Sequence, residues 1–128
     1  MWLALLIFLF SGLCTANEAE IQTCTFDFDK NGVSDAAVYF KVKEEYRLVA
    51  LLNTGEKTEA VKLFSSKEKM TLSCRQGNSV KETQAGKGEK KSVEHKTNGT
   101  YIELTLPECS SVAFYYKDGK FHEVWTSD

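Results

Sequence analysis

The segment from Asp27 to Asp35 is the part of the sequence whose residue types and spacing could carry chemistry. Oxygen-bearing side chains stand at alternate positions at its start, and a further carboxylate closes it. Loops that wrap calcium use this spacing, with short oxygen ligands at the first, third and fifth positions, a backbone carbonyl at the seventh, and a direct or water-mediated ligand at the ninth. The sequence therefore predicts a candidate calcium site with the ligand set Asp27, Asp29, Asn31, Val33 and Asp35.

The same segment also has an interpretation without metal. Gly32 supplies a sharp turn, Phe28 would anchor it in the core, and the short polar side chains can accept backbone N–H bonds in a self-contained turn. An EF-hand is excluded, because Val38 stands at the twelfth position, where that motif places a bidentate glutamate. Both interpretations stay open, and a bound ion is expected to act in stability rather than in catalysis.

Few other residues are suited to chemistry. His95 and His122 are the only two histidines, and both lie in or beside alternating strand patterns, where a surface imidazole is the expected role. No two cysteines have the close spacing of a zinc site. We therefore predict that the protein is not an enzyme.

The N-terminal segment predicts export. Residues 2–13 form an uncharged apolar run of the length of a signal-peptide core, and this run is too short to span a bilayer comfortably. Small residues at Cys14 and Ala16 fit cleavage after Ala16. Lipidation of Cys14 is the alternative, but Leu13 occupies the place where a small residue is needed. We expect a periplasmic or extracellular protein without a transmembrane anchor once the signal is removed.

Three cysteines remain after this cleavage, which permits one disulfide and leaves one thiol over. The sequence alone does not determine which cysteines pair. We predict a bond between Cys74 and Cys109, because both lie at the ends of predicted strands that bracket a polar segment.

Composition limits the remaining classes. The chain has 128 residues, 42% of them hydrophobic, so a signal peptide over residues 1–16 leaves residues 17–128 as one domain able to bury a core. The formal net charge is −2, with acidic and basic residues interspersed. Because nucleic-acid binders carry a basic patch, no nucleic-acid partner is expected.

The elements that must position these residues are strands. Short segments rich in β-branched and aromatic residues, separated by Gly, Asn and Asp, indicate an all-β domain. The mainly antiparallel strands are expected to number about seven to nine, in a twisted sheet folded as a sandwich or open barrel. Strands are predicted at residues 38–42, 46–52, 60–64 and 70–74. Residues 75–91 are mostly polar and predict a mobile loop or a long exposed hairpin end.

Two Gly-containing dipeptides predict tight hairpins. Asn98-Gly99 separates residues 93–96 from 101–106, and Asp118-Gly119 separates 112–116 from 121–125. The second hairpin carries an aromatic cluster that either fills the core or forms an exposed patch for a partner: Phe114, Tyr115, Tyr116, Phe121 and Trp125. Alternation favours the core for most of the cluster and predicts that Tyr115 is the exposed member.

Residues 27–38, with the sequence Asp-Phe-Asp-Lys-Asn-Gly-Val-Ser-Asp-Ala-Ala-Val, resemble the opening of FG-GAP or VCBS-type repeat units. In that family an Asp-rich loop joins two strands of a propeller blade, and the resemblance implies calcium ligands at Asp27, Asp29, Asn31 and Asp35. The match covers only this segment, and the internal repeat that a propeller requires is absent from the sequence.

A second resemblance covers the order of the acidic loop, residues 48–53 and residues 112–128, which end in an aromatic hairpin and a Trp-x-Ser-Asp tail. Small exported proteins of Gram-negative bacteria, for which no function is established, share this order. The resemblance implies a periplasmic protein and supplies no catalytic residues.

These patterns favour a non-enzymatic binding or envelope accessory protein whose partner is another envelope or secreted protein. Two alternatives remain: an inhibitor or immunity-type protein directed against a specific enzyme, and a calcium-stabilised FG-GAP-like structural module.

Overall fold

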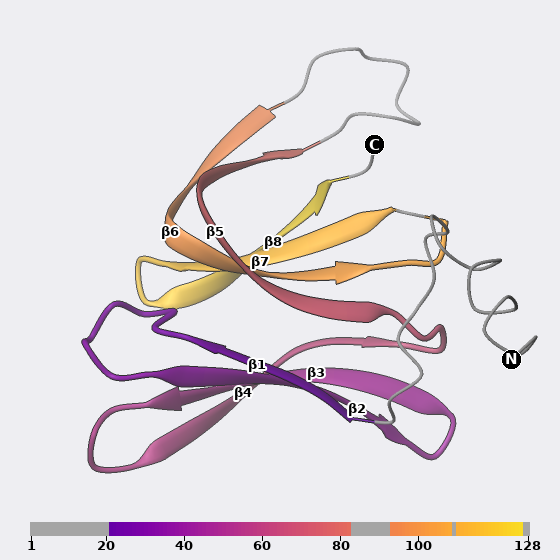
Figure 1. Cartoon of the computed structure of the whole chain (residues 1–128), viewed down its shortest axis with the longest axis horizontal. Helices are drawn as coiled ribbons and strands as arrows, with labels where there is room; N and C mark the ends of the chain where they lie inside the picture. Colours follow the sequence, from indigo (N-terminus) through magenta and orange to yellow (C-terminus); the bar gives the residue numbers. More distant parts are fainter. Residues whose placement is uncertain (1–20, 83–92, 109, 127–128) are drawn as a thin grey trace, which may run out of the picture.

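The computed structural model describes residues 21–82, 93–108 and 110–126, and these residues form strands and turns without a helix. Eight strands make two four-stranded antiparallel sheets that stack as the two layers of a sandwich (Figure 1). The N-terminal sheet has the order β1 (Ile21–Phe26), β2 (Asp35–Val42), β3 (Glu45–Asn53), β4 (Thr58–Ser66). The C-terminal sheet has the order β5 (Thr71–Glu82), β6 (Val93–Thr105), β7 (Ser111–Lys117), β8 (Lys120–Thr126). The predicted all-β sandwich is confirmed.

The predicted signal peptide, residues 1–16, lies outside the described residues. In the part of the chain that the structure describes, no helix has the length and apolar character needed to cross a membrane.

The N-terminal sheet buries one face of each of its central strands. In β2 and β3 the side chains that point inward are buried, and they alternate with partly exposed ones: Ala37, Tyr39, Leu48, Ala50 and Leu52. Small and large residues alternate along this face. Ala37 pairs with Ala50, and the next pair, Tyr39 with Leu48, is large. The segment 46–52 therefore forms an internal strand, as its apolar run predicts, but only one of its faces is fully buried.

The C-terminal sheet supplies the other half of the core. Ile102 and Leu104 of β6 lie opposite Phe114 and Val112 of β7, and all four side chains are buried. Most of the aromatic cluster of the last hairpin joins this core, because Phe114 is buried and Tyr116 and Phe121 pack against it partly buried. Together the two inner faces form the apolar core between the sheets.

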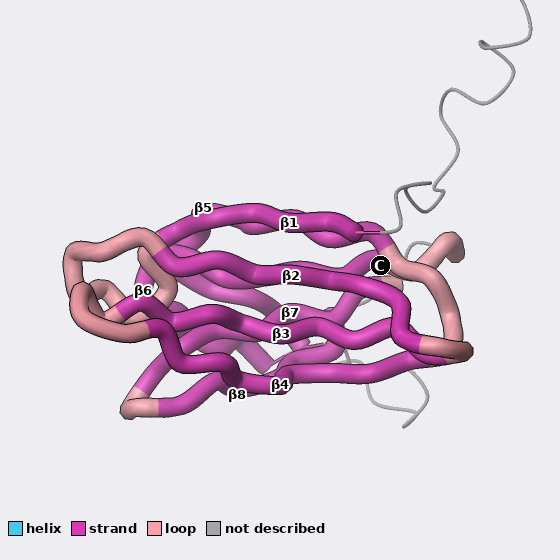
Figure 2. The backbone as a smooth tube through the Cα atoms, turned by 90° about the horizontal axis from the view of Figure 1, so that it is seen from below, coloured by secondary structure: helices cyan, strands magenta, loops and turns pink. Residues whose placement is uncertain are grey.

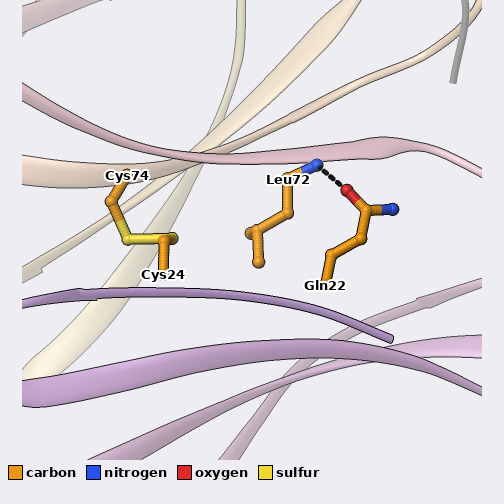
Figure 3. Close-up of a disulfide and its surroundings, with 4 residues drawn as sticks. All are labelled: Gln22, Cys24, Leu72 and Cys74. Atoms are coloured by element: carbon orange, nitrogen blue, oxygen red, sulfur yellow. Dashed lines mark hydrogen bonds between the residues drawn. A yellow bond between two sulfur atoms is a disulfide. The ribbon is translucent and has the colours of Figure 1, made fainter. Parts of the chain in front are cut away.

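One flank of the sandwich is closed by contacts between β1 and β5, which belong to different sheets (Figure 3). Cys24 and Cys74 form a disulfide with a Cα–Cα distance of 5.7 Å. The buried side chain of Gln22 makes two hydrogen bonds to the backbone at the start of β5. Its amide nitrogen donates to the Met70 carbonyl at 2.8 Å, and its carbonyl oxygen accepts the Leu72 N–H at 2.8 Å.

The predicted pairing of Cys74 with Cys109 is therefore wrong. Cys74 lies inside β5, opposite Ile102, on the side of that strand that faces the core and β1. The prediction assumed that Cys74 ends a strand beside the polar segment, whereas the strand continues for eight more residues, to Glu82. Cys109 itself lies outside the described residues.

Continuation of β5 also corrects the prediction for residues 75–91. Residues 75–82 are strand, paired with β6, and only residues 83–91 of that segment lie outside the described residues. The distal part of the β5–β6 hairpin curls over the outer face of the C-terminal sheet (Figure 1). Val80, the single larger aliphatic residue of the segment, is 6% exposed there and packs with Ala113, Tyr115 and Val124. Val80 therefore helps to hold the polar hairpin on the sheet, together with Tyr101 and the contact of His95 with Tyr115.

The hairpin predicted at Asn98-Gly99 is absent, because β6 runs through both residues. Gly77 pairs with Gly99 and Ser79 with Lys96, so two residues of β6 oppose one of β5 in a β-bulge. The Asn98 side chain donates to the Phe28 carbonyl at 2.6 Å and to the Tyr116 carbonyl at 3.0 Å. These contacts explain why a dipeptide typical of turns bends a strand here instead of reversing it.

The Asp118-Gly119 hairpin is confirmed. Lys117 pairs with Lys120, and both turn residues have positive φ, 56° and 81°, as a two-residue turn of the primed type requires. Tyr115 is not the exposed aromatic residue: it is 6% exposed because the β5–β6 hairpin covers it. Trp125 is the exposed member of the cluster, at 41%.

Candidate metal centre

The acidic loop joins the end of β1 to the start of β2, at one end of the N-terminal sheet. The fold brings three of its carboxylates together: one oxygen each from Asp27, Asp29 and Asp35 lie within 4.8 Å of one another. Asp27 and Asp29 are partly exposed, whereas Asp35, the first residue of β2, is buried. The calcium site itself, with Asn31 and Val33 as further ligands, stays a prediction.

The loop backbone folds around these carboxylates. Lys30 and Gly32 have φ of 61° and 90°, the left-handed conformation that suits glycine and strains other residues. The two oxygens of Asp27 accept the Asn31 N–H at 3.1 Å and the Gly32 N–H at 2.8 Å, and Asp29 accepts the Asn31 N–H at 3.3 Å. The loop therefore has the backbone hydrogen bonds that the metal-free interpretation predicts.

Asp35 fixes the loop to the sheet. This residue is only 2% exposed. Its carboxylate accepts the Phe28 N–H at 2.9 Å and the Asn53 N–H at 2.8 Å, so one side chain joins the loop to the end of β3. The Asn31 amide donates to the Asn53 carbonyl at 2.8 Å and completes the connection. Asn53 was not among the predicted site residues, although the turn signal of Asn-Thr-Gly at 53–55 marks the place where β3 ends.

The two remaining predicted ligands take part in the turn. The Asn31 side-chain carbonyl accepts the Val33 N–H at 2.9 Å. Carbonyl and carboxylate oxygens each have two lone pairs, so accepting one N–H does not prevent them from binding a cation. The hydrogen bonds show how Asn31 and Val33 hold the loop, and their role as ligands remains a prediction.

The donor set fits calcium. Oxygen ligands lie about 2.3–2.6 Å from calcium, so two ligands on opposite sides of one ion are separated by about 4.6–5.2 Å. The three carboxylate oxygens, within 4.8 Å of one another, match the spacing of atoms that surround one ion. Carboxylate, amide and backbone oxygens are also the ligands that hard cations prefer.

The surroundings of Asp29 disfavour its ionised form. Partial burial raises the pKa of this carboxyl above its ordinary value of 3.8, and the charge of Asp35 raises it further, while the Asn31 N–H opposes both effects. Ionised Asp29 is therefore unfavourable in the metal-free loop, and a cation would remove this cost.

This raised pKa predicts the pH dependence of stability without metal. Protonated Asp29 contributes stability below its ordinary pKa of 3.8, and this contribution is lost as the pH rises through the raised value. In chelator, Asp29→Asn is expected to raise the Tm at neutral pH and to change it little in acid, because asparagine keeps an acceptor without the charge. Thermal melts of both proteins at the two pH values test this. A lower Tm of the variant at neutral pH would contradict the electrostatic account.

A shallow hollow of about 230 Å³ lies beside the loop on the outer face of the N-terminal sheet. Polar and apolar residues line it: Thr25, Ser34, Asp35, Ala36, Leu51, Asn53 and Thr58. Drug-sized ligands occupy larger pockets, so this hollow is better suited to one or a few small groups.

Both histidines lie on the outer face of the C-terminal sheet, on either side of Tyr115. The His95 ring contacts the Glu82 carboxylate at 2.9 Å and the Tyr115 hydroxyl at 3.4 Å. His122 stacks on the Tyr115 ring at 5.1 Å, and its Nε2 contacts the Lys117 carbonyl at 3.0 Å. Burial raises the pKa of the Tyr115 phenol, which keeps it protonated and unsuited to act as a nucleophile. The two histidines are far apart in the sequence. They come together because β7, which carries Tyr115, lies between β6 and β8 in the sheet.

Comparison of the chain with protein-family models, with curated proteins and with solved structures finds no match. The FG-GAP resemblance of the acidic loop and the resemblance to small exported bacterial proteins therefore stay predictions.

Proposed function

We propose that this protein is an exported, non-enzymatic β-sandwich that binds one calcium ion in the loop between β1 and β2 as a structural ion. The observation that supports it is the convergence of Asp27, Asp29 and Asp35, whose oxygens lie within 4.8 Å of one another. Calcium would join the start of β2 to the residues that follow β1 and would offset the partial burial and the charge of Asp35, which together raise the pKa of Asp29.

Export is supported by the disulfide between Cys24 and Cys74, because such bonds persist in oxidising compartments and are rare in the cytosol. The signal-peptide pattern of residues 1–16 points the same way. Calcium is also more abundant outside the cytoplasm, where modules with affinities of about 0.1–1 mM are used.

A binding role in the envelope, rather than catalysis, is supported by how the titratable side chains are used. His95 contacts Glu82 and Tyr115, which holds the β5–β6 hairpin together and against the sheet. His122 contacts the Lys117 carbonyl and stacks on Tyr115, which holds the β7–β8 hairpin. The contacts of the acidic loop are those of a turn, because its carboxylate and amide oxygens accept backbone N–H bonds of the same segment.

An NMR titration with calcium tests the site directly. Wild-type protein, prepared in chelator and exchanged into buffer, is expected to show saturable shifts of the Asn31 and Gly32 amides, with a Kd of about 0.1–1 mM. Asp29→Asn is expected to weaken binding at least about tenfold, because it removes a ligand charge from the site. Glu56→Gln, which removes one exposed charge from the β3–β4 turn, is the matched control and should bind as wild type.

Two outcomes contradict the proposal. In the first, the amide signals of the wild-type loop do not shift when calcium is added. In the second, Asp29→Asn binds calcium as tightly as Glu56→Gln does. Either result would leave the loop with the role of a metal-free turn, for which its backbone hydrogen bonds are sufficient.

A further inference from the structure

The sequence contains two Asn-Gly dipeptides, Asn31-Gly32 and Asn98-Gly99. In such a pair the main-chain nitrogen of glycine can attack the side-chain carbonyl carbon of the asparagine before it, because glycine has no Cβ to obstruct the approach. Water later opens the cyclic imide that forms, and asparagine becomes aspartate or isoaspartate. The fold places the two dipeptides in different surroundings, so their reactivity in the folded protein should differ.

The first dipeptide is open to solvent. Asn31 and Gly32 are both exposed, in the connection between β1 and β2. Figure 2 shows this connection as a loop at one end of the sandwich, beyond the ends of the strands. A Cβ added at Gly32 would meet no atom within 4 Å, so the surroundings leave room for the imide ring.

Hydrogen bonds prepare both reacting groups of this dipeptide. The Gly32 N–H donates to Asp27 Oδ2 at 2.8 Å, so a carboxylate is within reach of the proton that the attacking nitrogen must lose. The Val33 N–H donates to the Asn31 side-chain oxygen at 2.9 Å. Negative charge develops on this oxygen when the nitrogen adds to the carbonyl carbon, and the donor stabilises it.

The second dipeptide is shielded. Asn98 and Gly99 lie inside β6 and are partly buried. The Asn98 amide nitrogen donates to the Phe28 and Tyr116 carbonyls at 2.6 and 3.0 Å, so the side chain cannot turn toward its own main chain without losing both bonds. The Gly99 N–H donates to the Thr97 hydroxyl at 3.0 Å, and a hydroxyl is a much weaker base than a carboxylate.

We propose that Asn31 is a site of spontaneous deamidation in the folded protein, with the Asp27 carboxylate as the first acceptor of the proton. The bond from the Gly32 nitrogen to Asn31 Cγ forms, the Cγ–Nδ2 bond breaks, and ammonia leaves with the Gly32 proton, which Asp27 passes to it. Water then adds to one imide carbonyl. Addition at the side-chain carbonyl gives aspartate, and addition at the main-chain carbonyl gives isoaspartate.

The modification changes the acidic loop. The Asn31 amide donates to the Asn53 carbonyl at 2.8 Å and so holds the loop to the end of β3. Neither product can replace this bond, because an ionised carboxylate only accepts hydrogen bonds. Aspartate adds a carboxylate to those of Asp27, Asp29 and Asp35, and isoaspartate also inserts a methylene into the main chain. Deamidation therefore weakens the connection to β3 and makes the loop more negative.

Ageing of the folded protein in chelator, at neutral pH over several weeks, tests the site without any contribution from a bound cation. Peptide mapping by mass spectrometry, in water labelled with heavy oxygen, identifies each residue that loses its amide during ageing. Asn31 is expected to react at least about tenfold faster than Asn98, because freeing the Asn98 side chain costs two hydrogen bonds. In urea, where the fold is lost, the two dipeptides should react at similar rates.

A pair of variants tests the proton acceptor. Asp27→Asn keeps an oxygen acceptor for the Gly32 N–H but removes the carboxylate, and it should slow the reaction of Asn31 at least about tenfold. Asp29→Asn is the matched control, because it removes the same charge from the loop, and its carboxylate accepts the Asn31 N–H instead of the Gly32 N–H. This control should react at least as fast as wild type. A merely looser loop would react faster, so slowing in Asp27→Asn separates proton transfer from loop disorder.

The proposal is overturned if Asn31 of the folded wild type keeps its amide for as long as Asn98 does. A difference between the two dipeptides that is equally large in urea would show that the fold does not select the site, and would overturn the proposal as well. If Asp27→Asn reacts as fast as Asp29→Asn, Asp27 is not the proton acceptor.

Discussion

Replacing Cys24 and Cys74 together by alanine is expected to lower the free energy of unfolding by about 4 kcal/mol, the largest effect that the structure predicts. The two cysteines are 50 residues apart in the sequence, so the bond restricts a long segment of the unfolded chain. For a domain of this size the loss corresponds to a decrease in Tm of roughly 15–30 °C. The chain segment between the cysteines spans β2, β3 and β4, so without the bond the N-terminal sheet is held to β5 by weaker contacts.

Thermal melts of the double variant and of the wild type, with and without reductant, test this. Cys109→Ser is the control for the pairing that the sequence suggested, and it is expected to keep the Cys24–Cys74 bond in non-reducing peptide mapping. Recovery of a peptide that links Cys74 to Cys109 would contradict the structure.

Asp35→Ala is expected to cost about 3 kcal/mol, the second largest effect. The buried carboxylate accepts N–H bonds from Phe28 and Asn53, and alanine leaves both donors without that acceptor. An unsatisfied buried donor costs about 1–3 kcal/mol, and relief of repulsion with Asp29 offsets only part of the loss. In chelator the Tm should fall by roughly 10–20 °C.

Ser34→Ala is the control for this prediction, because Ser34 is exposed and lies next to Asp35 in the sequence. Substitutions at such surface positions change stability by about 0.5 kcal/mol or less. If urea unfolding gave equal free energies for Asp35→Ala and Ser34→Ala, the carboxylate would not be the connection between the loop and β3.

Local patterns predicted the parts of the fold that depend on neighbours in sequence. The apolar run at residues 46–52 indicated an internal strand, and β3 lies between β2 and β4. Asp118-Gly119 predicted a two-residue turn because its residues adopt positive φ without much cost, and the hairpin forms there. The acidic loop likewise depends on side-chain spacing within one short segment, and oxygens of Asp27, Asp29 and Asp35 lie within 4.8 Å of one another, while their role as calcium ligands stays a prediction.

Long-range contacts decided the features that local patterns did not predict. Asn98-Gly99 has the same turn signal as Asp118-Gly119, but the Asn98 amide is held by the Phe28 and Tyr116 carbonyls, and the chain continues as a bulged strand. The disulfide partner of Cys74 depends on which strands become neighbours at the edge of the sandwich. The spacing of the cysteines in the sequence does not show that β1 and β5 are neighbours.

Burial of Tyr115 depended on a similar contact. Its strand alternation indicated an exposed position, and the cover comes from Val80, in a segment whose composition predicted a loop. The composition of this hairpin is mostly polar, but Val80, Tyr101 and His95 give it contacts with the sheet beneath.

Melting of the wild-type protein in chelator and in calcium tests the central claim most directly. With calcium about tenfold above its Kd, binding to the folded state adds about 1.4 kcal/mol, so the Tm should rise by roughly 5–10 °C. Magnesium at the same concentration should give a smaller rise, because it demands a smaller octahedral site and dehydrates reluctantly. The same midpoint in chelator and in calcium would contradict the claim that the loop of Asp27, Asp29 and Asp35 is a calcium site.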